Sequence, residues 1–261
     1  MTDAIQGLWI GNRLSTFEQL CIASFLAHGH EFHLYAYKEL EGVPKGTTVI
    51  DASKIIPEKE IFTYHNGSYA GFADWFRWEL LAQRGGYWVD MDIICFKHFD
   101  FTDEIVFGIQ HANEPAVGVL RLPAGHALAS HMIERCLDPH KEFPYDPRRT
   151  RIHKWVRRNL RGNRRHDIYW GEAGGPLGFA KALKHFGLMD AGKNYTYFYP
   201  VHYSHWKAIF DDTLGNDVNL FSTTYAVHLW NELLRAASFN KDATYPENSL
   251  IESLKRRYLA R

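Results

Sequence analysis

YWVDMDIICF, residues 87–96, is an apolar run that is interrupted only by Asp90 and Asp92. Its length and its branched side chains predict a buried strand. Because successive side chains of a strand alternate between its two faces, we expect Asp90 and Asp92 on the same side. Two neighbouring carboxylates repel each other unless a positive charge lies between them, and oxygen ligands suit Mg²⁺ or Mn²⁺. The pair predicts a divalent metal site, with a solvated strand end as the alternative.

The rest of the chain predicts alternating strands and helices. Short apolar runs predict strands over residues 5–10, 31–37, 48–51, 105–109, 116–122 and 224–230. Helical spacing and caps predict helices over 15–29 and about 68–84, and near 125–137, 151–161, 176–186 and 248–258. Strands that alternate with helices indicate a parallel sheet with crossover helices. We therefore expect an α/β fold with one domain over 1–261 and a basic helical insertion at about 138–170.

Composition excludes several classes of protein. The 261 residues contain 46% hydrophobic residues, and Lys+Arg and Asp+Glu both number 30, so the chain is globular and formally neutral. A dedicated nucleic-acid binder would normally carry a basic excess. Three cysteines without a C-x-x-C pair argue against a disulfide framework or a structural zinc site. No secretory start and no apolar run of membrane-spanning length are present, so we expect a cytoplasmic protein that can lie peripherally at a membrane.

The longer stretch FADWFRWELLAQRGGYWVDMD, residues 72–92, resembles a glycosyltransferase signature. Its pattern is (S/A)-D-x-F-R-(Y/W)-x-x-L-x-x-x-G-G-x-(Y/W)-x-D-x-D, from the sugar-binding region that contains the DXD motif. Similar enzymes are the α-1,4-galactosyltransferases, capsular polysaccharide transferases and, more distantly, the glucosylating bacterial toxins. Weaker resemblance lies at residues 9–11, 175–176 and 228–231, whereas Ala173-Gly174-Gly175-Pro176 departs from the more usual T-G-P.

This resemblance implies a GT-A fold, with a Rossmann-like central mixed sheet flanked by helices. It also implies a nucleotide-diphosphate sugar donor, expected to be UDP-linked, and Mn²⁺ or Mg²⁺ as the cofactor. Asp90, Asp92 and Arg77 would then be the catalytic residues. Donor-binding residues would be Trp9, Gly11, Asp74, Arg77 and Asp90, with Trp9 stacked on the uracil ring. Metal ligands would be Asp92, Asp90, His228 and Asn231.

The resemblance predicts a metal-dependent transferase that moves a hexose to a hydroxyl of a saccharide or glycolipid with retention of anomeric configuration. Two other functions remain open: an aspartyl phosphatase or phosphotransferase, and a non-catalytic sugar-nucleotide-binding protein. The residues also have simpler interpretations, since Asp74 and Arg77 could form a surface ion pair, His228 could be a core residue, and Trp9 could simply be buried on the first strand. Glu172 is a candidate nucleophile, although a front-face reaction would need none.

Residues 148–165, RRTRIHKWVRRNLRGNRR, contain nine of the 30 Lys and Arg residues. A solvated helix face is one interpretation of such a run. The other two are contact with an anionic acceptor, such as a lipid-linked phosphosugar, and peripheral contact with an anionic membrane. Trp155 among the arginines suits an interfacial position. Nucleic acid is not expected as a partner, because the stretch is short and the whole chain is neutral.

Overall fold

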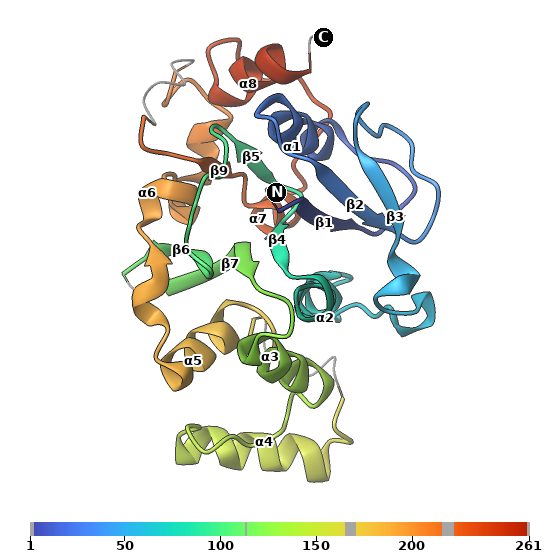
Figure 1. The fold of residues 1–261 in the computed structure, drawn as a ribbon, viewed down its shortest axis with the longest axis vertical. Coiled ribbons are helices and arrows are strands. Elements are labelled where there is room, and N and C mark those ends of the chain that lie inside the picture. The colour runs from blue at the N-terminus through green and yellow to red at the C-terminus, as the bar shows by residue number, and fades with distance from the viewer. Residues whose placement is uncertain (1–2, 113, 165–170, 216–221, 260–261) are drawn as a thin grey trace.

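The computed structural model describes residues 3–112, 114–164, 171–215 and 222–259. A seven-stranded sheet with the strand order β3-β2-β1-β4-β7-β6-β8 lies at the centre and is flanked by helices (Figure 1). A separate two-stranded sheet pairs β5 with β9. The predicted α/β class with a central mixed sheet is therefore confirmed. No helix in these described ranges is both long and apolar enough to cross a membrane.

Helices and strands follow one another along the chain from a short N-terminal strand to a C-terminal helix. They are β1 (Ile5–Trp9), α1 (Thr16–Ala27), β2 (Phe32–Ala36), β3 (Thr48–Asp51), the 3₁₀ helices η1 (Ala52–Lys54) and η2 (Glu58–Glu60), α2 (Ala70–Arg84), β4 (Gly86–Val89), β5 (Ile93–Cys95), β6 (Val106–His111), β7 (Glu114–Leu122), α3 (Ala127–Leu137), α4 (Arg148–Leu160), α5 (Pro176–Phe186), η4 (Met189–Ala191), β8 (Gly192–Lys193), α6 (Tyr195–Phe198), η5 (Tyr203–Ile209), β9 (Ala226–His228), α7 (Asn231–Ala236) and α8 (Leu250–Tyr258).

The sheet has a parallel half and an antiparallel half. Strands β3, β2, β1 and β4 run parallel, as the alternating strands and helices predict. Beyond β4 the direction changes, because β7 pairs antiparallel with β4 and with β6. The carboxyl ends of four parallel strands therefore meet at one edge of the sheet. In open α/β sheets this edge is where ligands bind.

The predicted single strand over residues 87–96 is wrong. β4 ends at Val89, and the backbone then turns, since the N–H of Ile93 donates to the carbonyl of Asp90 at 3.1 Å. The chain continues as β5, which pairs with β9 and not with the main sheet. The apolar pattern could not reveal the turn, because the residues on both sides of it are buried. The predicted strand over 224–230 likewise shortens to β9.

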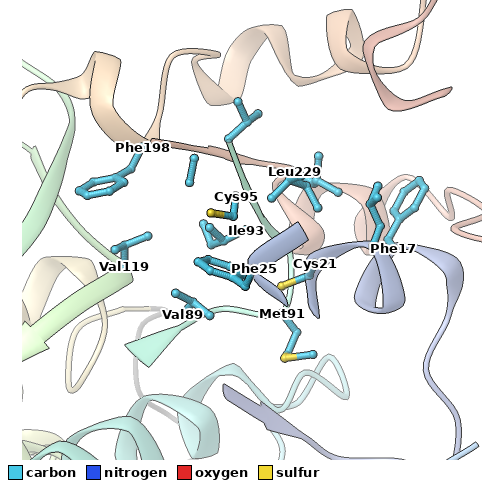
Figure 2. Close-up of a cluster of buried hydrophobic side chains, with 14 of the residues drawn as sticks. Phe17, Cys21, Phe25, Val89, Met91, Ile93, Cys95, Val119, Phe198 and Leu229 are labelled. Carbon is cyan, nitrogen blue, oxygen red and sulfur yellow. The ribbon is translucent and has the colours of Figure 1, made fainter. Parts of the chain in front are cut away.

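Two apolar clusters cover the opposite faces of the sheet. Side chains of β4 alternate between them, since Tyr87 and Val89 face the cluster formed with α1 and α8, whereas Trp88 faces α2, α3 and α5. Figure 2 shows the first cluster, in which Met91 from the turn lies beside Cys21 of α1. Because Met91 packs into this core, the turn is anchored between the sheet and α1.

Local sequence explains where α1 begins and where α2 ends. Ser15 and Glu18 form the expected capping box at the start of α1. α2 ends at Gly85, whose φ of 63° lies in the left-handed region that glycine adopts without strain. A Cβ atom at Gly85 would also lie 2.5 Å from the backbone nitrogen of Ala124. This glycine therefore permits the close passage that brings α2 directly into β4.

His30 gives the fold a testable pH dependence. Its ring is buried, stacks on His98 at 4.1 Å, and accepts a hydrogen bond from the N–H of Phe99 at 3.0 Å. Burial lowers the pKa of His30 to about 4, and positive charge on His98 and His28 acts in the same direction. The folded protein thus holds this ring neutral, whereas the unfolded chain binds a proton near pH 6.5.

We expect the free energy of unfolding to fall by roughly 2–3 kcal/mol through His30 as the pH drops from 7 to 4.5. The His30→Gln variant keeps an acceptor for Phe99 but removes the titration. Urea unfolding of both proteins at the two pH values measures the difference in their pH dependence. A parallel loss of stability in wild type and variant would contradict the assignment.

Candidate active site

The turn after β4 is held by the segment that follows β9. The Asp92 carboxylate lies 3.1 Å from Nε2 of His228 and accepts a hydrogen bond from the backbone N–H of Asn231 at 2.6 Å. The backbone carbonyl of Asp92 accepts a second hydrogen bond, from the N–H of Leu229 at 2.9 Å. Residues more than 130 positions apart are brought together because Ile93 of β5 pairs with His228 of β9.

Asp90, Asp92 and His228 form a group that could hold a metal ion. One ligand atom from each of the three lies within 4.8 Å of the other two. Two neighbouring ligands at about 2.1 Å from one ion lie about 3 Å apart, and opposite ligands about 4 Å apart. The 3.1 Å separation of the Asp92 oxygen and the His228 nitrogen matches the first value. Two carboxylates and an imidazole therefore fit a divalent cation.

Charge within this group favours the ionised forms of two buried residues. Burial alone would raise the pKa of Asp92, but the charge and hydrogen bond of His228 and the N–H of Asn231 outweigh it and lower the pKa. Burial alone would lower the pKa of His228, but the charge and hydrogen bond of Asp92 raise it. His228 does not lie in a purely apolar core, because its ring lies beside two carboxylates, and its role as a metal ligand stays a prediction. The role of the Asn231 side chain as a metal ligand stays a prediction, since Asn231 binds Asp92 through its backbone.

A buried arginine orients the other aspartate of the turn. Arg77 and Asp74 lie one helical turn apart on α2, and Nη1 of Arg77 donates to Asp74 at 2.7 Å. Nη2 of Arg77 donates to Oδ1 of Asp90 at 2.8 Å, and Nε1 of Trp88 donates to the same oxygen at 2.8 Å. Arg77 is only 3% exposed, so the interpretation of Asp74 and Arg77 as a surface ion pair is wrong.

Burial acts in opposite directions on the pKa values of Asp74 and Arg77. It raises the pKa of Asp74 to about 6, although the Arg77 guanidinium opposes the shift. Burial would lower the pKa of Arg77, but Asp90 and Asp74 together raise it. Arg77 therefore stays charged at the centre of the cluster, and its Nε has no hydrogen-bond partner among the described residues.

The loop before α5 packs closely against Asp74. A Cβ atom at Gly175 would lie 2.8 Å from the Asp74 carboxylate, and one at Gly174 would lie 2.5 Å from Sγ of Cys136. The two glycines therefore permit a close approach of the loop to α2, which carries Asp74, and to α3, which carries Cys136. Glu172 in this loop points elsewhere, since its carboxylate pairs with Arg157 of α4 at 3.1 Å.

A cavity of about 520 Å³ opens at the carboxyl ends of β1 and β2. It is lined by Ile10, Gly11, Asn12, Tyr37, Lys38, Glu58, Ile61 and Tyr69. Gly11 lines this cavity and Trp9 does not, and the donor-binding roles of both stay predictions. Nε1 of Trp9 donates to the carbonyl of Arg13 at 2.9 Å, and Nζ of Lys241 lies 5.4 Å from the centre of its ring.

Sequence reasoning missed the two tyrosines of this cavity. Tyr37 directly follows β2, and Tyr69 directly precedes α2. The position of Tyr37 at the carboxyl end of a parallel strand is a signal that could have identified it. Nothing in the local sequence marks Tyr69, because its place opposite β1 depends on how α2 packs against the sheet.

Comparisons with known proteins concern a different part of the chain from the 72–92 signature. Residues 192–258 match the family model described as "Alpha 1,4-glycosyltransferase conserved region". The resemblance to α-1,4-glycosyltransferases is thereby confirmed, and the matched segment contains His228 and Asn231. No curated protein matches the sequence. The seven-stranded mixed sheet also agrees with the GT-A fold that the resemblance implies.

Solved structures with similarity to this chain include two glycosyltransferases. One is "PaToxG Glycosyltransferase", with 14% identity, a TM-score of 0.48, and coverage of 99% of this chain and 85% of that chain. The other is the apo-form glycosyltransferase GlyE of Streptococcus pneumoniae, with 11% identity and a TM-score of 0.39. This chain spans 64% of the GlyE chain, which covers 100% of this one.

Removal of the buried guanidinium tests the cluster around Arg77. The Arg77→Met variant leaves the Asp74 and Asp90 carboxylates without their positive partner, so we expect a loss of about 3–5 kcal/mol in the free energy of unfolding. Addition of Asp74→Asn should restore part of this loss, because one buried charge is then removed. Urea unfolding at pH 7 measures both effects.

Arg235→Met is the matched control, because Arg235 forms an exposed pair with Glu232 that is also three residues apart. It should cost less than about 1 kcal/mol. Equal losses in Arg77→Met and Arg235→Met would show that the Arg77 cluster does not carry the stability assigned to it.

Proposed function

We propose that the chain is a metal-dependent glycosyltransferase. It moves a hexose from a nucleotide-diphosphate sugar, UDP-linked, to a hydroxyl of a saccharide or glycolipid, with retention of anomeric configuration. The observation that carries the proposal is the meeting of Asp90, Asp92 and His228. The two aspartates come from the segment with the DXD signature, and His228 comes from the segment that matches the family model.

The cavity at the ends of β1 and β2 supports a site for the donor nucleoside. Its volume of about 520 Å³ is within the usual range for small-molecule sites. Tyr37 and Tyr69 offer rings on which a base can stack, which is worth about 1–3 kcal/mol per base. β4 lies beside β1 in the sheet, so the diphosphate of a nucleoside bound there can extend toward Asp90.

Asp92, Asp90 and His228 would hold the cation. When bound, the cation supplies positive charge that stabilises the departing diphosphate, a contribution of several kcal/mol. Arg77 donates to Asp74 and Asp90 and is only 3% exposed, so its part is to fix Asp90 rather than to contact the donor directly. Oδ1 of Asp90 is occupied by Arg77 and Trp88, which leaves Oδ2 for the cation or the donor.

The carboxylates of the site support a reaction without a protein nucleophile. Asp74 and Asp90 are engaged by Arg77, Asp92 by His228, and Glu172 by Arg157. In a front-face reaction, the bond from the anomeric carbon to the phosphate oxygen breaks as the bond to the acceptor oxygen forms. The acceptor proton passes to the departing phosphate oxygen, so the new bond forms on the same face of the sugar.

Substitution of a proposed metal ligand tests the activity. Wild type should hydrolyse or transfer from a UDP-hexose with Mn²⁺ or Mg²⁺ present, and Asp92→Asn should lower the rate about 100-fold or more, since a metal ligand is lost. Asp103→Asn, in an exposed carboxylate paired with Lys193 at 2.8 Å, is the control and should retain the wild-type rate. Release of UDP, measured with and without a chelator, provides the assay.

Two results would favour the other functions. Turnover of a phosphomonoester without turnover of any sugar nucleotide would indicate a phosphatase. Metal-dependent binding of UDP without any turnover would indicate a binding protein.

Loss of an exposed ring tests the nucleoside cavity. Tyr69 is 43% exposed, so Tyr69→Ala should leave the melting temperature of the free protein nearly unchanged. We expect it to weaken UDP binding about 5- to 100-fold, because one stacking partner is lost. Tyr195→Ala, at a tyrosine that is 49% exposed, is the matched control. Thermal shift with UDP and Mn²⁺ compares the three proteins, and an equal shift in all three would place the base elsewhere.

A further inference from the structure

The polarity of α4 is opposite to that of an ordinary surface helix. Its exposed side chains include Ile152, Trp155 and Leu160, which are 53%, 51% and 70% exposed. Its most buried side chain is Lys154, which is only 1% exposed. With about 3.6 residues per turn, the three apolar residues share one side of the helix and Lys154 lies on the other. Surface helices normally turn their apolar side toward the core.

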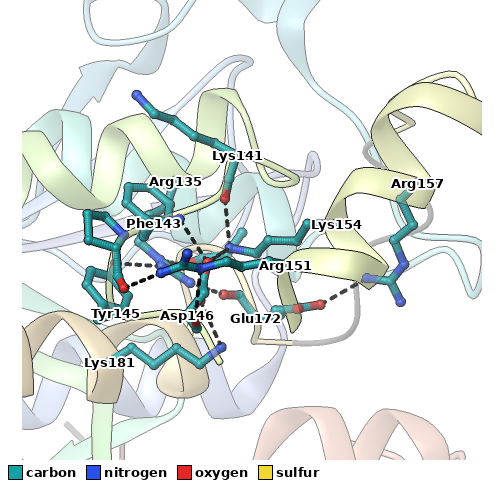
Figure 3. Close-up of polar contacts among 12 residues, drawn as sticks. Arg135, Lys141, Phe143, Tyr145, Asp146, Arg151, Lys154, Arg157, Glu172 and Lys181 are labelled. Atoms are coloured by element: carbon teal, nitrogen blue, oxygen red, sulfur yellow. Dashed lines mark hydrogen bonds and ion pairs between the residues drawn. The ribbon is translucent and has the colours of Figure 1, made fainter. Parts of the chain in front are cut away.

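Polar contacts fix this orientation from the inner side (Figure 3). Nζ of Lys154 donates to Asp146 at 2.7 Å and to the carbonyl of Lys141 at 2.8 Å. Arg157 pairs with Glu172 at 3.1 Å. Both members of the Lys154–Asp146 pair are almost fully buried, so rotation of the helix would leave a buried carboxylate without its partner. The outward position of the apolar residues is therefore a stable property of the fold.

The outward side of α4 also carries positive charge. Residues 147–164 contain no acidic residue, and Arg148, Arg149 and Arg158 are exposed, whereas Arg151 donates to the carbonyls of Asp146 and Pro144 on the inner side. Arg158 pairs with Asp138 at 3.0 Å. For Arg148 and Arg149, no carboxylate partner occurs within the described ranges of the chain. An apolar strip with arginines beside it is complementary to one kind of surface, an anionic phospholipid bilayer.

We infer that α4 docks the protein on an anionic membrane surface. Ile152, Trp155 and Leu160 enter the boundary between headgroups and acyl chains, and the arginines bind lipid phosphates. α4 lies at one end of the long axis of the molecule, beyond α3, so the described body of the protein does not block a flat surface from reaching it (Figure 1). A second copy is a poorer occupant, because two such surfaces would bring their arginines together.

This inference goes beyond the proposed function and does not depend on it. It concerns where the protein works, whereas the reaction concerns the site at the carboxyl ends of the parallel strands.

Vesicle sedimentation tests the inference with the full chain, in the absence of sugar nucleotide. Wild type should bind vesicles of phosphatidylcholine with about a third phosphatidylglycerol, and should bind pure phosphatidylcholine at least tenfold more weakly. Binding should also weaken in about 1 M salt, where the Debye length is about 3 Å. The Ile152→Ser/Leu160→Ser variant should bind the anionic vesicles at least tenfold more weakly than wild type.

Val49→Ser is the matched control, because Val49 is 49% exposed on β3, away from α4. It should bind as wild type does. All variants should keep the melting temperature and UDP-hexose turnover of wild type, which separates a docking defect from misfolding or a damaged active site.

Three outcomes would overturn the inference. They are absence of binding to anionic vesicles at low salt, equal binding to neutral and anionic vesicles, and unchanged binding by the α4 variant. Sedimentation velocity adds a fourth, since a concentration-dependent dimer that the α4 variant abolishes would make a second copy the occupant. Vesicle binding and sugar-nucleotide turnover are separate measurements, so failure of one leaves the other standing.

Discussion

The buried guanidinium of Arg77 is the interaction on which the candidate site depends. It lies between Asp74 on its own helix and Asp90 in the turn after β4, and it packs over the Trp88 ring at 5.1 Å. A charge taken out of water at this depth is stable only with well-placed partners of opposite sign. The pair of contacts therefore holds α2, β4 and the turn in one arrangement, and leaves a single oxygen of Asp90 facing the site.

A second set of contacts joins the turn after β4 to a segment near the C-terminal end of the chain. Asp92 uses both its carboxylate and its backbone carbonyl to bind residues 228–231. Trp230 makes this possible by adopting a left-handed conformation with a φ of 62°, which costs a non-glycine residue about 1 kcal/mol. Its indole donates to the carbonyl of Val201 at 3.0 Å, which helps to offset that cost. The strained residue turns the N–H of Asn231 toward Asp92.

Buried charges with partners of opposite sign fix both the candidate site and the orientation of α4, with different results. Around Arg77, charged groups are buried because each has a partner, and the remaining unshared oxygen becomes available for chemistry. Under α4, the buried pair of Lys154 and Asp146 sets the rotation of the helix and leaves its apolar side in water. In both places a buried ion pair decides what the protein presents to its surroundings. Apolar packing, in contrast, shapes the two faces of the sheet.

The sequence by itself determined the α/β class and most elements, and it singled out Asp74, Arg77, Asp90 and Asp92 as candidate site residues, because periodicity and the spacing of a motif are local properties. It placed the two aspartates of the turn together by an argument from strand alternation, although the backbone turns there. Only the tertiary structure decided that β5 leaves the main sheet, that His228 meets Asp92, and that Trp9 lies outside the cavity. These features depend on pairing between β5 and β9 and on the burial of charges that are far apart in the sequence. Contacts between distant residues produce no periodic pattern in the sequence, so sequence reasoning could not predict them.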